Sequence, residues 1–265
     1  MKEEIENFLA ADIVILHFHD KIQEFGVLVN KNIAKIHNNI SPKPTAGSAL
    51  WSISANIFSL HRSILALCKN GWSLATPIIL RTMVECYLNV LIITTDDASS
   101  EYFGFKYLFN FLKKNLNDKH FSEEDREGFR KQIDEGLKKL PNNIRNKAKD
   151  FIFKKSFNSY WYSPEYSGPT KVIGQRNDLK RIYALFSGAT HGGLFGLNFL
   201  KGKPDDVHPN PRKDKFSQNF ALIYSNKIML DAFYSIGTFE GLQLQESYNF
   251  LRKNFLELKP LVKKL

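Results

Sequence analysis

The feature that most constrains the fold of this chain is an apolar period of three to four residues that recurs along most of its length. In residues 3–38 the apolar side chains return to one face, which is the pattern of a long amphipathic helix. The residues on this predicted face are Ile5, Phe8, Leu9, Ile13, Leu16, Ile22, Phe25, Val29, Ile33 and Ile36. Strand alternation of convincing length occurs nowhere in the chain. The sequence therefore predicts an all-α protein.

Boundary signals divide the rest of the chain into further helices. Gly71 is suited to a left-handed C-terminal cap, Pro77 is tolerated in an early helical turn, and Ser122 precedes three acidic residues as an N-cap does. We expect a single-domain helical bundle over residues 1–265, with its core at about 45–200 and long terminal helices at about 3–38 and 216–257. The other expected helices are 49–70, 73–95, 98–116, 122–140 and 176–192, and the expected irregular segments are 40–48, 140–174 and 201–214.

Composition narrows the class of protein. At 265 residues and 43% hydrophobic, the chain can bury a substantial core. Cys68 and Cys86 lie inside apolar helical patterns and predict buried thiols in a reducing setting. The start MKEEIENFLAAD lacks the features of a signal peptide, and the apolar segment 77–95 is interrupted by Arg81 and Glu85. We expect a soluble, cytoplasmic protein with no membrane partner.

The charge balance favours a polyanionic partner. The formal net charge is +10, which attracts phosphate without regard to sequence. Residues 106–155 hold 14 Lys and Arg against 8 Asp and Glu, and residues 171–215 hold 9 against 4. Between these segments lies an aromatic stretch that is expected to form an ordered loop or lid and either stacks on bases or joins the core. Its aromatic residues are Tyr160, Trp161, Tyr162 and Tyr166.

Arg81 and Glu85 are the charged residues of the apolar segment RTMVECYLNVLII. They lie one helical turn apart, and neither can be buried without a partner, so we expect an ion pair. Such a pair either fixes the register of its helix or presents a planar guanidinium to a phosphate or carboxylate ligand. The residue types leave both interpretations open.

A second polar constellation lies in YALFSGATHGG. Tyr183, Ser187 and His191 follow one another at intervals of four and form one stripe on a helix. A hydrolase triad is disfavoured because the chain has no GxSxG elbow. Two interpretations remain: Ser187 bonds back to its own helix while His191 caps a neighbouring one, or the stripe joins Arg81 in an anion or nucleotide site.

RTMVECYLNVLII and YALFSGATHGG together resemble the bacterial helical family called domain of unknown function 5677, over about residues 45–200. That family looks distantly similar to HEPN domains, helical modules of toxin–antitoxin and phage-defence systems. The resemblance implies a HEPN-like core, and many HEPN domains are metal-independent ribonucleases that work as dimers. The HEPN motif places an Arg four to six residues before its His, whereas the nearest Arg before His191 is Arg181.

Arg81 can supply from another helix the cation that the HEPN motif supplies locally. His191 would then act as acid or base, Arg81 would stabilise the phosphorane, and Glu85 would orient one of them. The chain has no phosphate-binding glycine loop and no metal-ligand spacing, so no cofactor is expected. Three hypotheses stand: a nucleic-acid effector, a non-catalytic module that binds a nucleotide or another anion, and a protein-interaction subunit. RNA or single-stranded nucleic acid is one expected partner, and a homo-oligomer (a dimer) or a partner protein is also expected.

Overall fold

The computed structural model describes residues 2–38, 43–70, 76–116, 118–153 and 215–263. These residues form helices and contain no strand, so the predicted all-α class is confirmed. The helices are α1 (Lys2–Asn38), α2 (Pro44–Lys69), α3 (Thr76–Thr95), α4 (Ser100–Asn115), α5 (Glu123–Lys139), α6 (Asn142–Phe153), α10 (Lys215–Phe239) and α11 (Gln245–Lys263).

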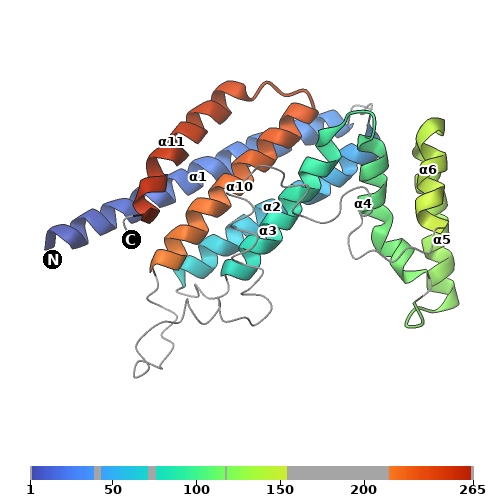
Figure 1. The fold of residues 1–265 in the computed structure, drawn as a ribbon, viewed down its shortest axis with the longest axis horizontal. Coiled ribbons are helices and arrows are strands. Elements are labelled where there is room, and N and C mark those ends of the chain that lie inside the picture. Colours follow the sequence, from blue (N-terminus) through green and yellow to red (C-terminus); the bar gives the residue numbers. More distant parts are fainter. Residues whose placement is uncertain (1, 39–42, 71–75, 117, 154–214, 264–265) are drawn as a thin grey trace.

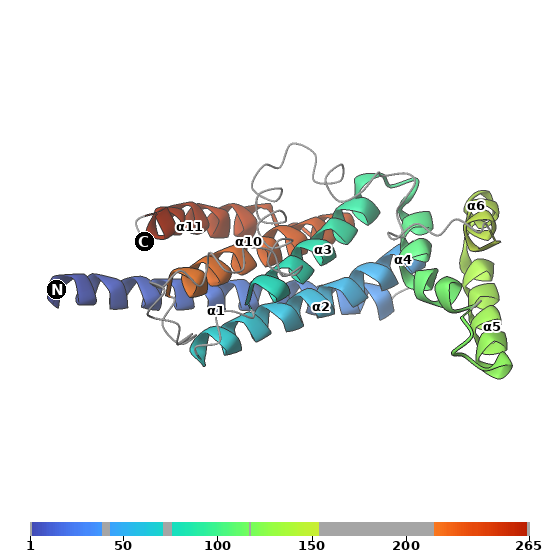
Figure 2. The same ribbon diagram turned by 60° about the horizontal axis from the view of Figure 1, so that its bottom comes forward.

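Five helices form a long bundle and three form an arm at one end of it. In the bundle, α3 packs against α2 and α10, α10 also packs against α1 and α11, and α4 leaves the end of α2 and α3 to carry α5 and α6 outward. Figures 1 and 2 show this arm, made of α4, α5 and α6, projecting from the bundle. There are two apolar clusters, and α4 contributes to both: Phe103 to the cluster of the bundle and Phe105 to the cluster of the arm.

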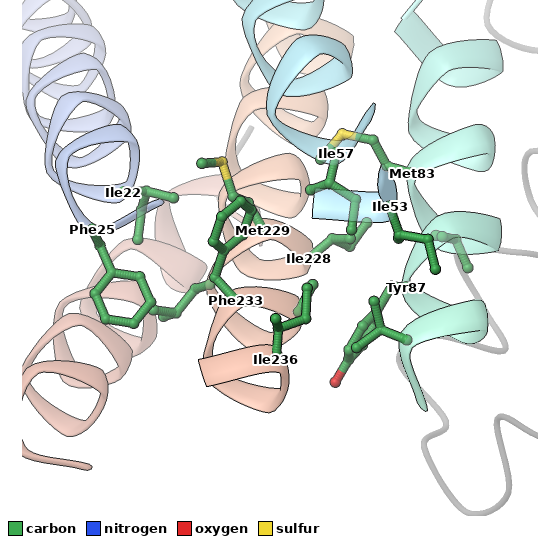
Figure 3. Packing of buried hydrophobic residues seen from close by; sticks show 14 of the residues in the cluster. Ile22, Phe25, Ile53, Ile57, Met83, Tyr87, Ile228, Met229, Phe233 and Ile236 are labelled. Carbon is green, nitrogen blue, oxygen red and sulfur yellow. The ribbon is translucent and has the colours of Figure 1, made fainter. Parts of the chain in front are cut away.

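Side chains from α1, α2, α3 and α10 build most of the bundle core, and α11 adds Leu251, Phe255 and Leu258. Figure 3 shows Phe233 and Ile228 of α10 between Ile22 of α1 and Tyr87 of α3. Each of these side chains is at most 1% exposed. Burial of this apolar surface is the main source of stability for such a bundle.

α3 is, within the part of the chain that the structure describes, the one helix long and apolar enough to cross a membrane. It nevertheless packs along α2 and α10 inside the bundle, and residues such as Leu80, Met83 and Val84 are fully buried there. α3 therefore contributes one face to the core of the bundle.

The long N-terminal helix is confirmed as α1, but one position of its predicted apolar face is wrong. Ile22, Phe25, Val29 and Ile33 are buried, whereas Ile13 is 67% exposed. Ile15 and Phe18 are buried, so the face that meets the bundle near residue 13 is displaced from the predicted one. The side chains of residues 2–12 and 36–38 are outside the described set.

The predicted irregular segment at 40–48 is too long, because α2 begins at Pro44. Proline is well suited to the first helical position, where its missing N–H is no loss. The N-cap residue Lys43 makes no side-chain cap, and the carboxylate of Glu101 in α4 accepts hydrogen bonds from the N–H groups of Thr45 and Ala46 instead. Glu101, which is 56 positions from Thr45, thus stabilises a helix start that lies earlier in the chain than local signals predict.

The predicted irregular segment at 140–174 is also wrong over residues 142–153, which form α6. Ile144, Ala148 and Ile152 recur every four residues and are buried in the cluster of the arm. Arg145 donates to the carbonyls of Leu137 and Leu140 at the end of α5, which ties the two helices together. The expected N-cap of α5 is confirmed, since Ser122 forms a capping box.

The expected single C-terminal helix over 216–257 is wrong, because it is divided into α10 and α11. Gly241 has a φ of +78°, and the bonds from Leu242 N–H to the Gly237 carbonyl and from Gly241 N–H to the Thr238 carbonyl form a Schellman motif. Leu244, which precedes α11, is buried over Gly237. A positive φ at Gly241 ends the first helix and reverses the chain.

Candidate functional site

Arg81 and Glu85 form the ion pair that their spacing predicts. Nε of Arg81 lies 3.1 Å from Oε1 of Glu85 on the same face of α3. The side chain of Arg81 is 17% exposed and that of Glu85 is 40% exposed, so the pair lies at the edge of the core and meets solvent. The carboxylate of Glu85 holds the guanidinium of Arg81 in one orientation.

The rest of the predicted polar site lies outside the described residues. This applies to Tyr183, Ser187 and His191, to Arg181, and to the aromatic loop at 160–166. The predicted convergence of His191 on Arg81 therefore stays a prediction. Among the residues that are described, no group of three or more His, Cys, Asp or Glu side chains could hold a metal ion.

Of the two predicted buried thiols, Cys68 is buried and Cys86 is half-buried, and neither forms a disulfide. Burial raises the pKa of each to about 12. For Cys86 the nearby Glu85 carboxylate raises the pKa further. A raised pKa disfavours the thiolate, which is the reactive form of cysteine.

A basic and aromatic site on the arm was not singled out residue by residue from the sequence. Lys106 and Lys113 of α4 both direct their ammonium groups at the ring of Phe151 in α6, at 5.2 and 4.1 Å from its centroid. Lys106 is only 1% exposed, and its ammonium also lies 5.1 Å from the ring of Tyr102. The site therefore combines two cations with aromatic faces.

Electrostatics at this site disfavour the charged form of Lys113. Desolvation by burial lowers its pKa first, and repulsion from Lys106 lowers it further. An anion bound at the half-buried ammonium group of Lys113 would offset both effects. The seven-residue spacing of Lys106 and Lys113 places both on one face of α4, which is the sequence signal that could have found the site.

The basic surface extends beyond these two lysines. Helices α4 and α6 together carry six Lys and Arg against two Asp and Glu. Lys114, Lys147 and Lys149 are exposed, and one of the two acids, Glu101, is engaged with the N-terminus of α2. On α5, by contrast, Glu123 and Glu127 pair with Arg130 within the helix. We call Lys113, Lys114, Lys147 and Lys149, with Phe151, the basic face of the arm.

Fold and site together define an all-helical protein with a basic, aromatic face on a projecting arm and a fixed Arg–Glu pair on its central helix. Residues 48–208 match the model of the Family of unknown function (DUF5677). Because this match covers more than half of the chain, the protein belongs to that family, as its two motifs predict. No curated protein and no solved structure matches the chain.

Proposed function

We propose that this protein is a HEPN-like helical effector that binds RNA or single-stranded nucleic acid through the basic face of its arm. The observation that supports the proposal best is the convergence of Lys106 and Lys113 on Phe151. Two neighbouring ammonium groups repel one another, and the phosphate backbone of a nucleic acid supplies the opposite charge along a line. The aromatic residues of the arm offer stacking surfaces for unpaired bases.

The exposed lysines make the direct contacts in this proposal. Lys114, Lys147 and Lys149 are exposed and can pair with successive phosphates. Lys106 is buried and acts through its field rather than by contact. A single strand that follows the basic face lies on the family-matched part of the chain, within residues 48–208.

Cleavage of the bound strand is the second part of the proposal. Arg81, oriented by Glu85, would stabilise charge that develops on a phosphate, and His191, on the stripe of Tyr183 and Ser187, would transfer a proton. This is metal-independent ribonuclease chemistry of the kind that acts in toxin and phage-defence systems. We further propose that the active form is a cytoplasmic dimer, as in many HEPN ribonucleases.

Charge reversal on the basic face tests binding. We expect the double variant Lys114→Glu and Lys147→Glu, at two exposed positions, to bind a fluorescein-labelled single-stranded RNA about 10-fold more weakly in anisotropy titrations at low salt. Loss of two phosphate contacts should reduce the slope of log K against log salt by about 1.4. The matched control is Arg252→Glu and Lys253→Glu on exposed positions of α11, which changes the net charge equally. Equal weakening by both variants would show that only net charge matters.

Two substitutions separate a catalytic from a structural site. If the site is chemical, Arg81→Ala and His191→Ala should each abolish RNA cleavage and cellular toxicity while the melting temperature changes by only a few degrees. A partly exposed ion pair such as Arg81–Glu85 contributes only about 0–1 kcal/mol to stability. If the wild-type protein binds RNA without cleaving it, and both variants fold but lose binding, the result would support the non-catalytic anion-binding module. Two unfolded variants would contradict the catalytic proposal.

A further inference from the structure

Two histidines stack face to face in the interior of the bundle. The ring centroids of His19 in α1 and His61 in α2 lie 3.8 Å apart, and the rings are inclined by 5°. Both residues are 0% exposed. Parallel stacking at this distance suits two neutral rings, whereas two imidazolium rings would repel each other strongly in an environment without water.

Hydrogen bonds tie the histidine pair (His19 and His61) to a third helix. Nε2 of His61 donates to Oδ1 of Asn226 in α10 at 2.6 Å, and the amide of Gln23 donates to Nε2 of His19 at 3.0 Å. The two neutral rings therefore carry their protons on different nitrogens: His61 on Nε2 and His19 on Nδ1. The Nδ1 atoms of both rings and Nδ2 of Asn226 are buried without a hydrogen-bond partner.

The surroundings hold few charges that could stabilise an imidazolium ring. Asp20 of α1 favours protonation of His19, Lys69 of α2 opposes it, and α10 contributes the uncharged amide of Asn226. Desolvation outweighs the favourable contributions, so the pKa of His19 is lowered to about 4. Desolvation, followed by the charge of His19, lowers the pKa of His61 well below its usual value.

We propose that the histidine pair is an acid-sensitive contact, which holds α1 on α2 and α10 while both rings are neutral and releases α1 when the pair takes up protons. The proposal is independent of the nucleic-acid function. A proton on Nδ1 of His61 or Nε2 of His19 places a cation against the face of the other ring. When the contact opens, water hydrates the imidazolium ring and removes the free-energy cost of burying its charge. The buried side chains of Ile22, Phe25 and Val29 on α1 become exposed at the same time.

The direction of the pH effect follows from proton binding. The open state binds protons with a pKa near 6.5, and the closed state binds them only at lower pH, near 4 for His19. The closed contact is therefore fully stable above about pH 6.5 and loses stability as the pH falls from there toward 4. The opening equilibrium should change by about 10-fold per pH unit for one proton taken up and about 100-fold for two.

Hydrogen exchange of the full chain between pH 7 and pH 5 tests the proposal. After correction for intrinsic exchange rates, protection of α1 should fall at least about 10-fold more than protection of α5 and α6 over this range. The double variant His19→Gln and His61→Gln should lose this difference. His17→Gln, on an exposed position of the same helix, should keep it. Equal loss of protection in α1 and in the arm, or the same response in both variants, would overturn the proposal.

A second measurement covers the case in which the double variant does not fold. A pH titration of the wild-type protein, labelled at its seven histidines, can be followed by NMR. His19 and His61 should stay neutral well below the ordinary histidine pKa of about 6.5, and their signals should change together with the hydrogen exchange of α1. Normal titration of His19 and His61 while α1 stays protected would refute the acid-sensitive contact.

Discussion

Gly104→Ala is expected to lower the free energy of unfolding by about 2–4 kcal/mol, because α4 crosses α2 too closely to admit a methyl group there. A Cβ at position 104 would lie 2.6 Å from Cα and 2.8 Å from the backbone nitrogen of Ala46. Backbone atoms cannot rotate away as a side chain can, so the helices must separate. Thermal melts should show a decrease of roughly 5–10 °C for a chain of this size.

Gly128→Ala is the matched control for this prediction. Gly128 is also a helical glycine of the arm, but a Cβ there would meet nothing within 4 Å. Alanine is favoured over glycine inside a helix by about 1 kcal/mol, so this variant should be slightly more stable than the wild type. If Gly104→Ala were as stable as Gly128→Ala, the close crossing of α4 and α2 would be wrong.

Glu101→Ala is expected to cost on the order of 3 kcal/mol, because it leaves the start of α2 without its acceptor. The carboxylate is 5% exposed and accepts from the N–H groups of Ala46 at 2.8 Å and Thr45 at 3.1 Å. Its negative charge also lies at the positive end of the α2 dipole. Urea unfolding followed by circular dichroism measures the loss directly.

Two further variants test whether the loss comes from these hydrogen bonds. Glu101→Gln keeps an oxygen acceptor and removes only the charge, so it should cost less than Glu101→Ala. Glu124→Ala removes an exposed carboxylate from the first turn of α5 and should cost under about 1 kcal/mol. A Glu101→Ala variant no less stable than Glu124→Ala would contradict the assignment of Glu101 as the cap of α2.

Gly104 and Glu101 belong to one joint between the arm and the bundle. Beside them, Lys43 pairs with Asp97 and lies over the ring of Phe239, which brings α10 to the same joint. The orientation of the basic face relative to Arg81 depends on this joint. The stability of each variant should therefore be measured before it is used in a binding experiment, and variants that weaken this joint should be left out.

Local periodicity and capping were sufficient to predict most of the helices. The apolar period of residues 3–38, the capping box at Ser122 and the pairing of Arg81 with Glu85 all depend on residues within a few positions of each other. Such interactions can be predicted from the sequence, because helical geometry brings residues i and i+3 or i+4 together wherever the helix lies in the fold. The family resemblance also rested on two short motifs, and the family match confirms it.

The errors lie where a distant residue or a single dihedral angle decides the outcome. The start of α2 depends on Glu101, and α6 is held by its packing on α4 and α5 although it has only three buried residues. The break between α10 and α11 depends on the left-handed conformation of Gly241, a residue that is also tolerated inside helices. Residues close in the sequence could not by themselves predict the start of α2, the formation of α6 or the break between α10 and α11.

By itself, then, the sequence determined the helical class, most helix positions, the net positive charge, the Arg81–Glu85 pair and the membership of the family. Tertiary structure alone decided that Lys106 and Lys113 meet at Phe151 and that His19 stacks on His61 beside Asn226. The physical reason is the range of the interactions. Helix formation depends on contacts within one or two turns, whereas His61 and Asn226 are separated by 165 positions and meet only when burial of the apolar faces sets the helices side by side.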